Sequence, residues 1–309
     1  MPQDPRTISI LLCTRNGATF LPEQLASYLR QSHTNWVLWI SDDGSTDGTL
    51  DLLRRFRADH GDRYDIRLLH GPRQGAAANF LSLLCHPDLP AGLVALSDQD
   101  DIWLPGKLAR ASRALPPDDP SPLVYSAQSF YIDAEGKRQG GSRPPSGGAP
   151  VFATAMLQNV MAGHSMVLNA PALALVRHAG PQRIAFHDWW LTLLVTASGG
   201  RAILDARRGV LYRQHAGNVL GAPGNLRAAL SRATRVLRRN YGEWVQANAR
   251  ALLSTSDLTP EVRVALTRFT TDPARAGAAR VRLLQSLGFR RQSRLGTMLC
   301  YLAAALGRL

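Results

Sequence analysis

Four short apolar runs, each followed by a polar turn and a helical pattern, constrain the fold of this chain more than any other feature. The runs are residues 8–13, 36–40, 66–69 and 93–96. After the first run, Leu21, Leu25, Tyr28 and Leu29 recur at helical spacing. Strands that alternate with helices in this way form a parallel sheet with helices on its faces. The sequence therefore predicts an α/β fold with a doubly wound, mostly parallel sheet.

Three carboxylates follow the fourth apolar run directly, in Ser97-Asp98-Gln99-Asp100-Asp101. Ligands of open α/β sheets bind beyond the carboxyl ends of the strands, which is where this cluster falls. The Asp-x-Asp formed by Asp98 and Asp100 offers hard oxygen ligands. Such ligands suit Mg²⁺ or Mn²⁺, which in turn hold phosphate oxygens. The alternative interpretation is a solvated turn, because aspartate is common in turns.

Polar clusters also follow the first two runs. Thr14-Arg15-Asn16-Gly17 follows the first, and Asp42-Asp43-Gly44-Ser45-Thr46-Asp47 follows the second. Ser45 or Thr46 is expected to cap the next helix, whose apolar face begins at Leu50. Since the ligand site of such a sheet lies at this edge, we expect the polar strand ends to converge on one ligand.

These segments, in this order, resemble the inverting family 2 glycosyltransferases of the GT-A fold. The matching segments are Cys13-Thr14-Arg15-Asn16-Gly17, Asp42-Asp43-Gly44-Ser45-Thr46-Asp47, Ser97-Asp98-Gln99-Asp100-Asp101 and Trp103-Leu104-Pro105-Gly106-Lys107-Leu108. Two later segments, His187-Asp188-Trp189-Trp190 and residues 212–218, resemble a rhamnosyltransferase-like subgroup. The resemblance covers residues 7–221 and implies a nucleotide-sugar donor, a dTDP- or UDP-sugar.

The resemblance also implies roles for individual residues. It assigns nucleotide binding to Thr14, Arg15, Asn16, Asp43, Arg73 and Asp98. It assigns a Mg²⁺ or Mn²⁺ ion to Asp98, Asp100 and His215, and the catalytic base to Asp188. Contact with the sugar or the acceptor is the expectation for Trp103, His164, His187 and Trp189, although a structural role in the core is the alternative for each.

Elementary chemistry supports a base at Asp188. Inverting transfer needs a carboxylate that takes the proton of the acceptor hydroxyl as the hydroxyl attacks the anomeric carbon. Asp188 stands at the start of an apolar helical pattern over residues 189–197, where the helix dipole favours negative charge. The alternative is an aspartate that only caps this helix.

Charge is distributed unevenly along the chain. The net charge is +13, and residues 222–309 contribute 15 Arg against 4 acidic residues. Leu226, Leu230, Ala233, Leu237 and Trp244 share one helical face, and arginines 232, 235, 238 and 239 fall opposite. This pattern is typical of a basic amphipathic helix on an anionic membrane surface. The alternative is a helical appendage that packs on the catalytic domain.

The remaining composition narrows the class of protein. Three cysteines in no Cys-x-x-Cys pattern argue against a disulfide framework, and no apolar run reaches the length of a membrane span. Residues 136–150, rich in Gly, Pro and Ser, are expected to form a loop. No nucleic-acid-binding module is recognisable, so nucleic acid is not an expected partner.

We therefore expect a GT-A domain at residues 1–221 and a basic helical region at residues 222–309. The expected enzyme is cytoplasmic, peripheral at the inner face of the plasma membrane, and transfers a sugar to a saccharide or lipid-linked acceptor during synthesis of a cell-surface polysaccharide. Rhamnose from dTDP-rhamnose is the expected donor sugar. The alternatives are a sugar nucleotidyltransferase, which would want a basic Gly-rich loop after the first strand, and a nucleotide-sugar-binding scaffold without catalysis.

Overall fold

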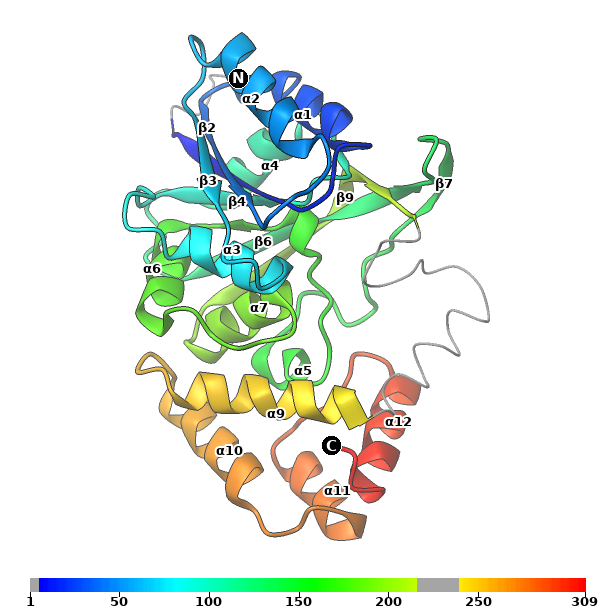
Figure 1. The fold of residues 1–309 in the computed structure, drawn as a ribbon. Helices are drawn as coiled ribbons and strands as arrows, with labels where there is room; N and C mark the ends of the chain where they lie inside the picture. The colour runs from blue at the N-terminus through cyan, green and yellow to red at the C-terminus, as the bar shows by residue number, and fades with distance from the viewer. Residues whose placement is uncertain (1–5, 216–238) are drawn as a thin grey trace.

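The predicted alternation of strands and helices opens the chain in the computed structural model, which describes residues 6–215 and 239–309 (Figure 1). The first four strands are each followed by a polar loop, and the first three loops lead into a helix. The elements are β1 (Ile8–Thr14), α1 (Leu21–Leu29), β2 (Trp36–Asp42), α2 (Thr49–His60), β3 (Ile66–His70), α3 (Ala76–Leu84) and β4 (Leu93–Ser97). All four predicted strands are confirmed.

The strands join one continuous sheet in the order β3-β2-β1-β4-β8-β6-β9-β5, and β7 pairs with β6. The elements after β4 are β5 (Ile102–Trp103), α4 (Lys107–Ala114), β6 (Leu123–Ile132), β7 (Arg138–Gly141), α5 (Phe152–Ala155), η1 (Gly163–Ser165), β8 (Val167–Leu168), α6 (Ala170–Ala179), α7 (His187–Ala197) and β9 (Arg201–Arg213). The strands β3, β2, β1 and β4 run parallel, whereas β8 is antiparallel to both β4 and β6. Strands β6 and β9 also run parallel, so the sheet is mixed, with parallel long pairings and short antiparallel ones.

Helices cover both faces of the sheet (Figure 1). Residues of β1 alternate between the two layers: Ile8, Ile10 and Leu12 pack with α1, α2 and α4, while Leu11 packs on the opposite side with α3, α6 and α7. Burial on both faces explains why these strands read as continuous apolar runs in the sequence.

Two local expectations were wrong. Helix α2 begins at Thr49 after Gly48 at the N-cap, so neither Ser45 nor Thr46 caps it. Ser45 instead bonds to Asn16 and Asp42, and Thr46 bonds to Asn16. At the start of the helix, the Asp47 carboxylate accepts from the N–H of Thr49. Residues 136–150 are not all loop either, because Arg138–Gly141 forms β7 against β6.

The C-terminal helices are α9 (Arg239–Leu253), α10 (Pro260–Thr271), α11 (Gly277–Ser286) and α12 (Arg294–Ala305). They pack beneath α5 and α7 and share one hydrophobic core with them (Figure 1). Tyr241 donates from its hydroxyl to the carbonyl of Leu157, and Trp244 lies edge-on to Phe186. The expected amphipathic helix from residue 226 lies outside the described residues up to 238, as does the expected boundary at residue 221. In the part of the chain that the structure describes, every helix is too short or too polar to cross a membrane.

Candidate active site

The loops that follow β1 and β2 are joined by a network centred on Asp42. Its buried carboxylate accepts hydrogen bonds from the Thr14 hydroxyl at 2.8 Å and from the backbone N–H groups of Gly44 and Ser45. Thr14 is itself buried. The predicted nucleotide residue Thr14 therefore lies at the sheet edge, and Asp42 holds it there.

Asp43 joins the second loop to the third. Its carboxylate accepts from the backbone N–H groups of Arg73 at 2.6 Å and Gly75 at 2.8 Å. Arg73 has a left-handed backbone with φ 58°, and its exposed side chain lies over Gly44. The structure thus brings Asp43 and Arg73 together, as the nucleotide-binding hypothesis requires. Each carboxylate oxygen keeps acceptor capacity for a further donor.

Gln99, the middle residue of the Asp-x-Asp, clamps the first loop to the fourth. Its side chain accepts from the N–H of Arg15 at 2.8 Å and donates to the carbonyl of Arg15 at 3.0 Å. Asn16, also exposed, accepts from the N–H of Thr46. A Cβ on Gly17 would overlap the Gln99 amide, so any larger residue here would displace the Gln99 side chain. Sequence reasoning missed Gln99, because its role depends on contact with a residue 84 positions away.

The loop that carries Asp98, Asp100 and Asp101 is held in place by β5 and β9, at the opposite end of the sheet from β3. Strand β5 follows the acidic residues and pairs with β9 at Val210 and Leu211. This pairing places the backbone N–H of Arg213 3.0 Å from Asp101 Oδ1, and His215 Nε2 2.8 Å from Asp100 Oδ2. Two of the three residues predicted to hold the metal are therefore in direct contact.

Asp98 lies close enough to other carboxylates to feel their charge. Burial, the charge of Asp100 and the charge of Asp188 together raise the pKa of Asp98 to about 7. Burial and the charges of Asp100 and Asp98 raise the pKa of the fully buried Asp101. Such mutual repulsion is the electrostatic setting that a divalent cation relieves.

The residues present fit a divalent cation. Ligand atoms of Asp98, Asp101 and His164 lie within 4.8 Å of one another, and the buried Asp101 Oδ2 has no hydrogen-bond partner. Carboxylate oxygens with one imidazole suit Mn²⁺, and carboxylates alone suit Mg²⁺. Asp101 and His164 are ligand candidates beside the predicted Asp98, Asp100 and His215. Asp101 had a sequence signal, since it follows Asp100 directly, whereas His164 comes from a separate element.

Asp188 lies in the first turn of α7, after Phe186 at the N-cap. Its carboxylate accepts from the backbone N–H of Trp189 at 2.7 Å and of Gly163 at 3.3 Å. The short helix η1, which contains Gly163, also carries His164, which has a ligand atom within 4.8 Å of those of Asp98 and Asp101, so η1 lies between Asp188 and the acidic cluster. The predicted base and the predicted metal site therefore lie on either side of η1, although 90 residues separate Asp98 and Asp188 in the chain.

The histidines predicted to contact sugar or acceptor have specific partners. His187 is buried beside Asp188, stacks on Phe80 at 4.1 Å between ring centroids, and leaves Nε2 without a hydrogen-bond partner. Burial lowers its pKa. His164 hydrogen-bonds to the Ser129 hydroxyl at 2.7 Å, and burial together with the charge of Lys107 lowers its pKa to about 3. Both imidazoles are therefore neutral near pH 7.

The two tryptophans predicted to contact sugar or acceptor lie in the core. Trp103 is 1% exposed and its ring lies 3.4 Å from Lys107 Nζ, an ammonium whose pKa is lowered by burial. Trp189 is 4% exposed and donates from its indole N–H to the carbonyl of Ala155. As packed here, neither indole offers a face to a sugar.

Comparison with known proteins identifies a domain in the N-terminal half of the chain. Residues 9–153 match the model of glycosyl transferase family 2. Residues 9–153 therefore carry a family 2 glycosyltransferase domain. The chain is 26% identical over 254 residues to the dTDP-rhamnosyl transferase RfbG of Shigella flexneri, covering 79% of this chain and 86% of that one. It is also 32% identical over 103 residues to the putative glycosyltransferase EpsE of Bacillus subtilis, which is 33% of this chain and 36% of that one.

Solved structures show the same fold. TarS 1–349 of S. aureus in complex with UDP-GlcNAc superposes with a TM-score of 0.61 at 14% identity, covering 98% of this chain and 89% of that one. The mannosyltransferase PcManGT of Pyrobaculum calidifontis, in complex with GDP-Man and Mn²⁺, gives 0.55 at 19% identity over 97% and 85%. The GT-A expectation is therefore confirmed.

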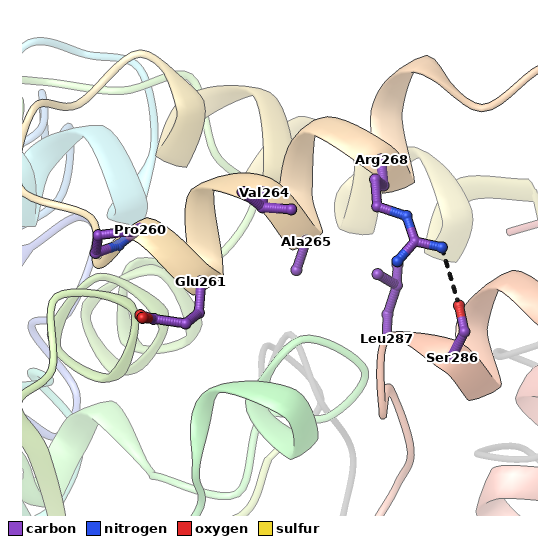
Figure 2. A pocket seen from close by; sticks show the side chains of 7 residues that line it. All are labelled: Pro260, Glu261, Val264, Ala265, Arg268, Ser286 and Leu287. Carbon is purple, nitrogen blue, oxygen red and sulfur yellow. Dashed lines mark hydrogen bonds between the residues drawn. The ribbon is translucent and has the colours of Figure 1, made fainter.

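The C-terminal helices carry a surface hollow that is separate from the acidic cluster. That hollow is lined by residues of α10 and the end of α11, and Arg268 there donates to the Ser286 hydroxyl (Figure 2). Its lining contains one carboxylate, Glu261, and no residue of the sheet edge. The hollow therefore shares no residue with the candidate site at the sheet edge.

Proposed function

We propose that this chain transfers rhamnose from dTDP-rhamnose to a saccharide or lipid-linked saccharide acceptor, with inversion at the anomeric carbon. The observation that carries the proposal is that η1 contacts Asp188 through Gly163 and the Asp98–Asp101 cluster through His164, at the edge of a family 2 glycosyltransferase domain. The similarity to a dTDP-rhamnosyl transferase over most of the chain supports the choice of donor.

The nucleotide is proposed to bind across the first three loops. The Asp43 carboxylate is suited to accept from the single N3–H donor of thymine or uracil, and it is already held by the N–H groups of Arg73 and Gly75. Thr14 supports this loop through Asp42. The exposed Arg15 and Arg73 supply positive charge near the diphosphate.

The transfer is proposed to be a single displacement. Asp188 accepts the proton of the acceptor hydroxyl, and the hydroxyl oxygen forms a bond to the anomeric carbon. The bond from that carbon to the diphosphate oxygen breaks, and its electron pair leaves with the nucleoside diphosphate. Asp98, Asp100, Asp101, His164 and His215 are the residues that would hold a Mg²⁺ or Mn²⁺ ion. When bound, the cation would stabilise the charge that develops on the departing diphosphate.

A donor panel tests the proposal. Purified protein with Mn²⁺ or Mg²⁺ is mixed with dTDP-rhamnose, other nucleotide sugars and candidate acceptors, and release of nucleoside diphosphate is measured. Release from dTDP-rhamnose above all other donors, with an inverted anomeric centre in the product by NMR, is the expected result. A retained anomeric configuration contradicts the mechanism, and preference for another donor contradicts the sugar. Pyrophosphate exchange in place of transfer would favour a nucleotidyltransferase.

The acceptor and the place of action complete the proposal. A lipid-linked saccharide would be glycosylated at the cytoplasmic face of the plasma membrane during synthesis of a surface polysaccharide. Among the relatives, a putative teichuronic acid biosynthesis glycosyltransferase of Bacillus subtilis supports a role in polysaccharide synthesis, at 30% identity over 103 residues.

A further inference from the structure

Helix α12 carries a row of apolar side chains on its outer face. Leu295, Met298, Leu302 and Leu306 are 69%, 66%, 48% and 54% exposed. Their spacing of three and four residues places them on one side of the helix and its end. The opposite side, with Cys300, Ala303 and Ala304, packs into the core. The helix is thus fixed by its inner face while its outer face lies at the surface of the described structure.

The chain segment that carries this face has charges of one sign. Residues 273–309 contain seven Arg and neither Asp, Glu nor Lys. Arg294, the first residue of α12, and Arg290, in the loop before it, are exposed, and Arg282 is exposed on α11, which packs against α12. An apolar stripe with exposed arginines beside it matches the pattern of helices that lie in a membrane interface.

Charge decides among the surfaces that could cover this stripe. A second copy of the chain would bring the same arginine-rich region against itself. Residues 216–238 also carry four Arg and no acidic residue, so covering by this segment would add like charge. Anionic phospholipid offers both an apolar layer and negative headgroups.

We propose that the outer face of α12 docks this protein on an anionic lipid surface. Leu295, Met298, Leu302 and Leu306 enter the boundary between headgroups and acyl chains, and Arg290 and Arg294 contact lipid phosphates. The inference deepens the proposed function, because a peripheral transferase meets a lipid-linked acceptor at such a surface. Only the reason for membrane docking rests on the proposed function. The docking face itself contains no residue of the sheet edge.

Vesicle co-sedimentation tests the proposal with the full chain. The vesicles are phosphatidylcholine alone or mixed with phosphatidylglycerol, at low and high salt. The apolar variant combines Leu295→Ser, Met298→Ser and Leu302→Ser, and Val264→Ser on α10, at 60% exposed, is the matched control. We expect wild type and control to bind anionic vesicles, and the apolar variant to bind at least about tenfold less. Arg290→Gln with Arg294→Gln should weaken binding about fivefold per arginine, with a smaller salt effect.

A local probe separates α12 from other basic segments. An environment-sensitive fluorophore on Met298→Cys should shift to the blue with anionic vesicles, and one on Val264→Cys should not. The unsubstituted chain gives the background from its three cysteines, of which Cys13 and Cys300 are buried. Equal vesicle binding by the apolar variant, or an unshifted probe at residue 298, would overturn the proposal.

Analytical ultracentrifugation covers the competing occupant. A wild-type dimer that the apolar variant converts to monomers would make this face a dimer interface and refute lipid docking. Release of nucleoside diphosphate with a water-soluble acceptor should be the same in all variants. Its absence in wild type would count against the proposed function alone, because vesicle binding is measured without donor.

Discussion

Asp188 is the residue on which the proposed chemistry depends most directly. Asp188→Asn should bind donor normally but transfer sugar about 10²–10⁴-fold more slowly, because an amide cannot take the hydroxyl proton. Single-turnover transfer and donor calorimetry separate the two effects. Thermal unfolding is the control, since the amide keeps the shape but loses an acceptor for the N–H of Gly163 or Trp189. Turnover near the wild-type rate would remove Asp188 from the role of base.

Substitutions of Asp100 and His215 test whether these two residues bind a metal ion. The two side chains are 2.8 Å apart, so each orients the other. Asp100→Ala should weaken Mn²⁺-dependent binding of dTDP about tenfold or more, and His215→Ala should have an effect of the same sign. Calorimetry with and without Mn²⁺ measures this. Asp51→Ala, which removes an exposed carboxylate on α2, is the matched control. Unchanged metal-dependent affinity in folded Asp100→Ala would exclude Asp100 as a ligand.

At the scale of elements, the site depends on loops that hold one another in place. Gly17→Ala would push its Cβ into the Gln99 amide, which must then release the backbone of Arg15. We expect a loss of about 1–3 kcal/mol in the free energy of unfolding and weaker nucleotide binding. Gly48→Ala is the matched control, because its Cβ would meet only Ala18 at 3.9 Å. Urea unfolding compares the two variants.

Removing the Gln99 side chain gives a second comparison for the same clamp. In the Gln99→Ala background, Gly17→Ala should cost much less stability, since the overlap is gone. Equal costs in both backgrounds would show that the strain arises elsewhere.

At the scale of the whole molecule, the C-terminal helices and the catalytic domain share one core. Tyr241, Val245, Leu252 and Phe269 are buried in the same cluster as Trp189. A chain ending at residue 221 would expose this apolar surface. We expect it to bind a hydrophobic dye and to aggregate on size-exclusion chromatography. A monomeric, dye-negative truncation with the thermal stability of the full chain would contradict the shared core. Point variants on α12 are therefore the sounder test of membrane binding.

The sequence alone determined the strands and the order of motifs. A short continuous apolar run such as residues 93–96 is typical of a strand that is buried on both faces. The polar residues after each run mark the carboxyl edge of the sheet. From these patterns and the family resemblance, the fold, the acidic cluster and the candidate base Asp188 were all predictable. The caps and turns were less so, since Ser45 bonds to Asn16 and Asp42 rather than to its own helix.

Only the tertiary structure decided which distant residues meet. The pairing of β5 with β9 brings His215 to Asp100, and η1 brings His164 to Asp98 and Asp101. The family resemblance grouped His215 with Asp100, but spacing alone predicts neither contact, because it carries no information about which strands of a mixed sheet become neighbours. The burial of Trp103 and Trp189 likewise depends on packing, since the sequence does not distinguish a tryptophan of the core from one that binds a sugar. Long-range strand pairing and layer packing therefore determine which side chains come together in the site, while the local sequence pattern determines the strands and loops that carry them.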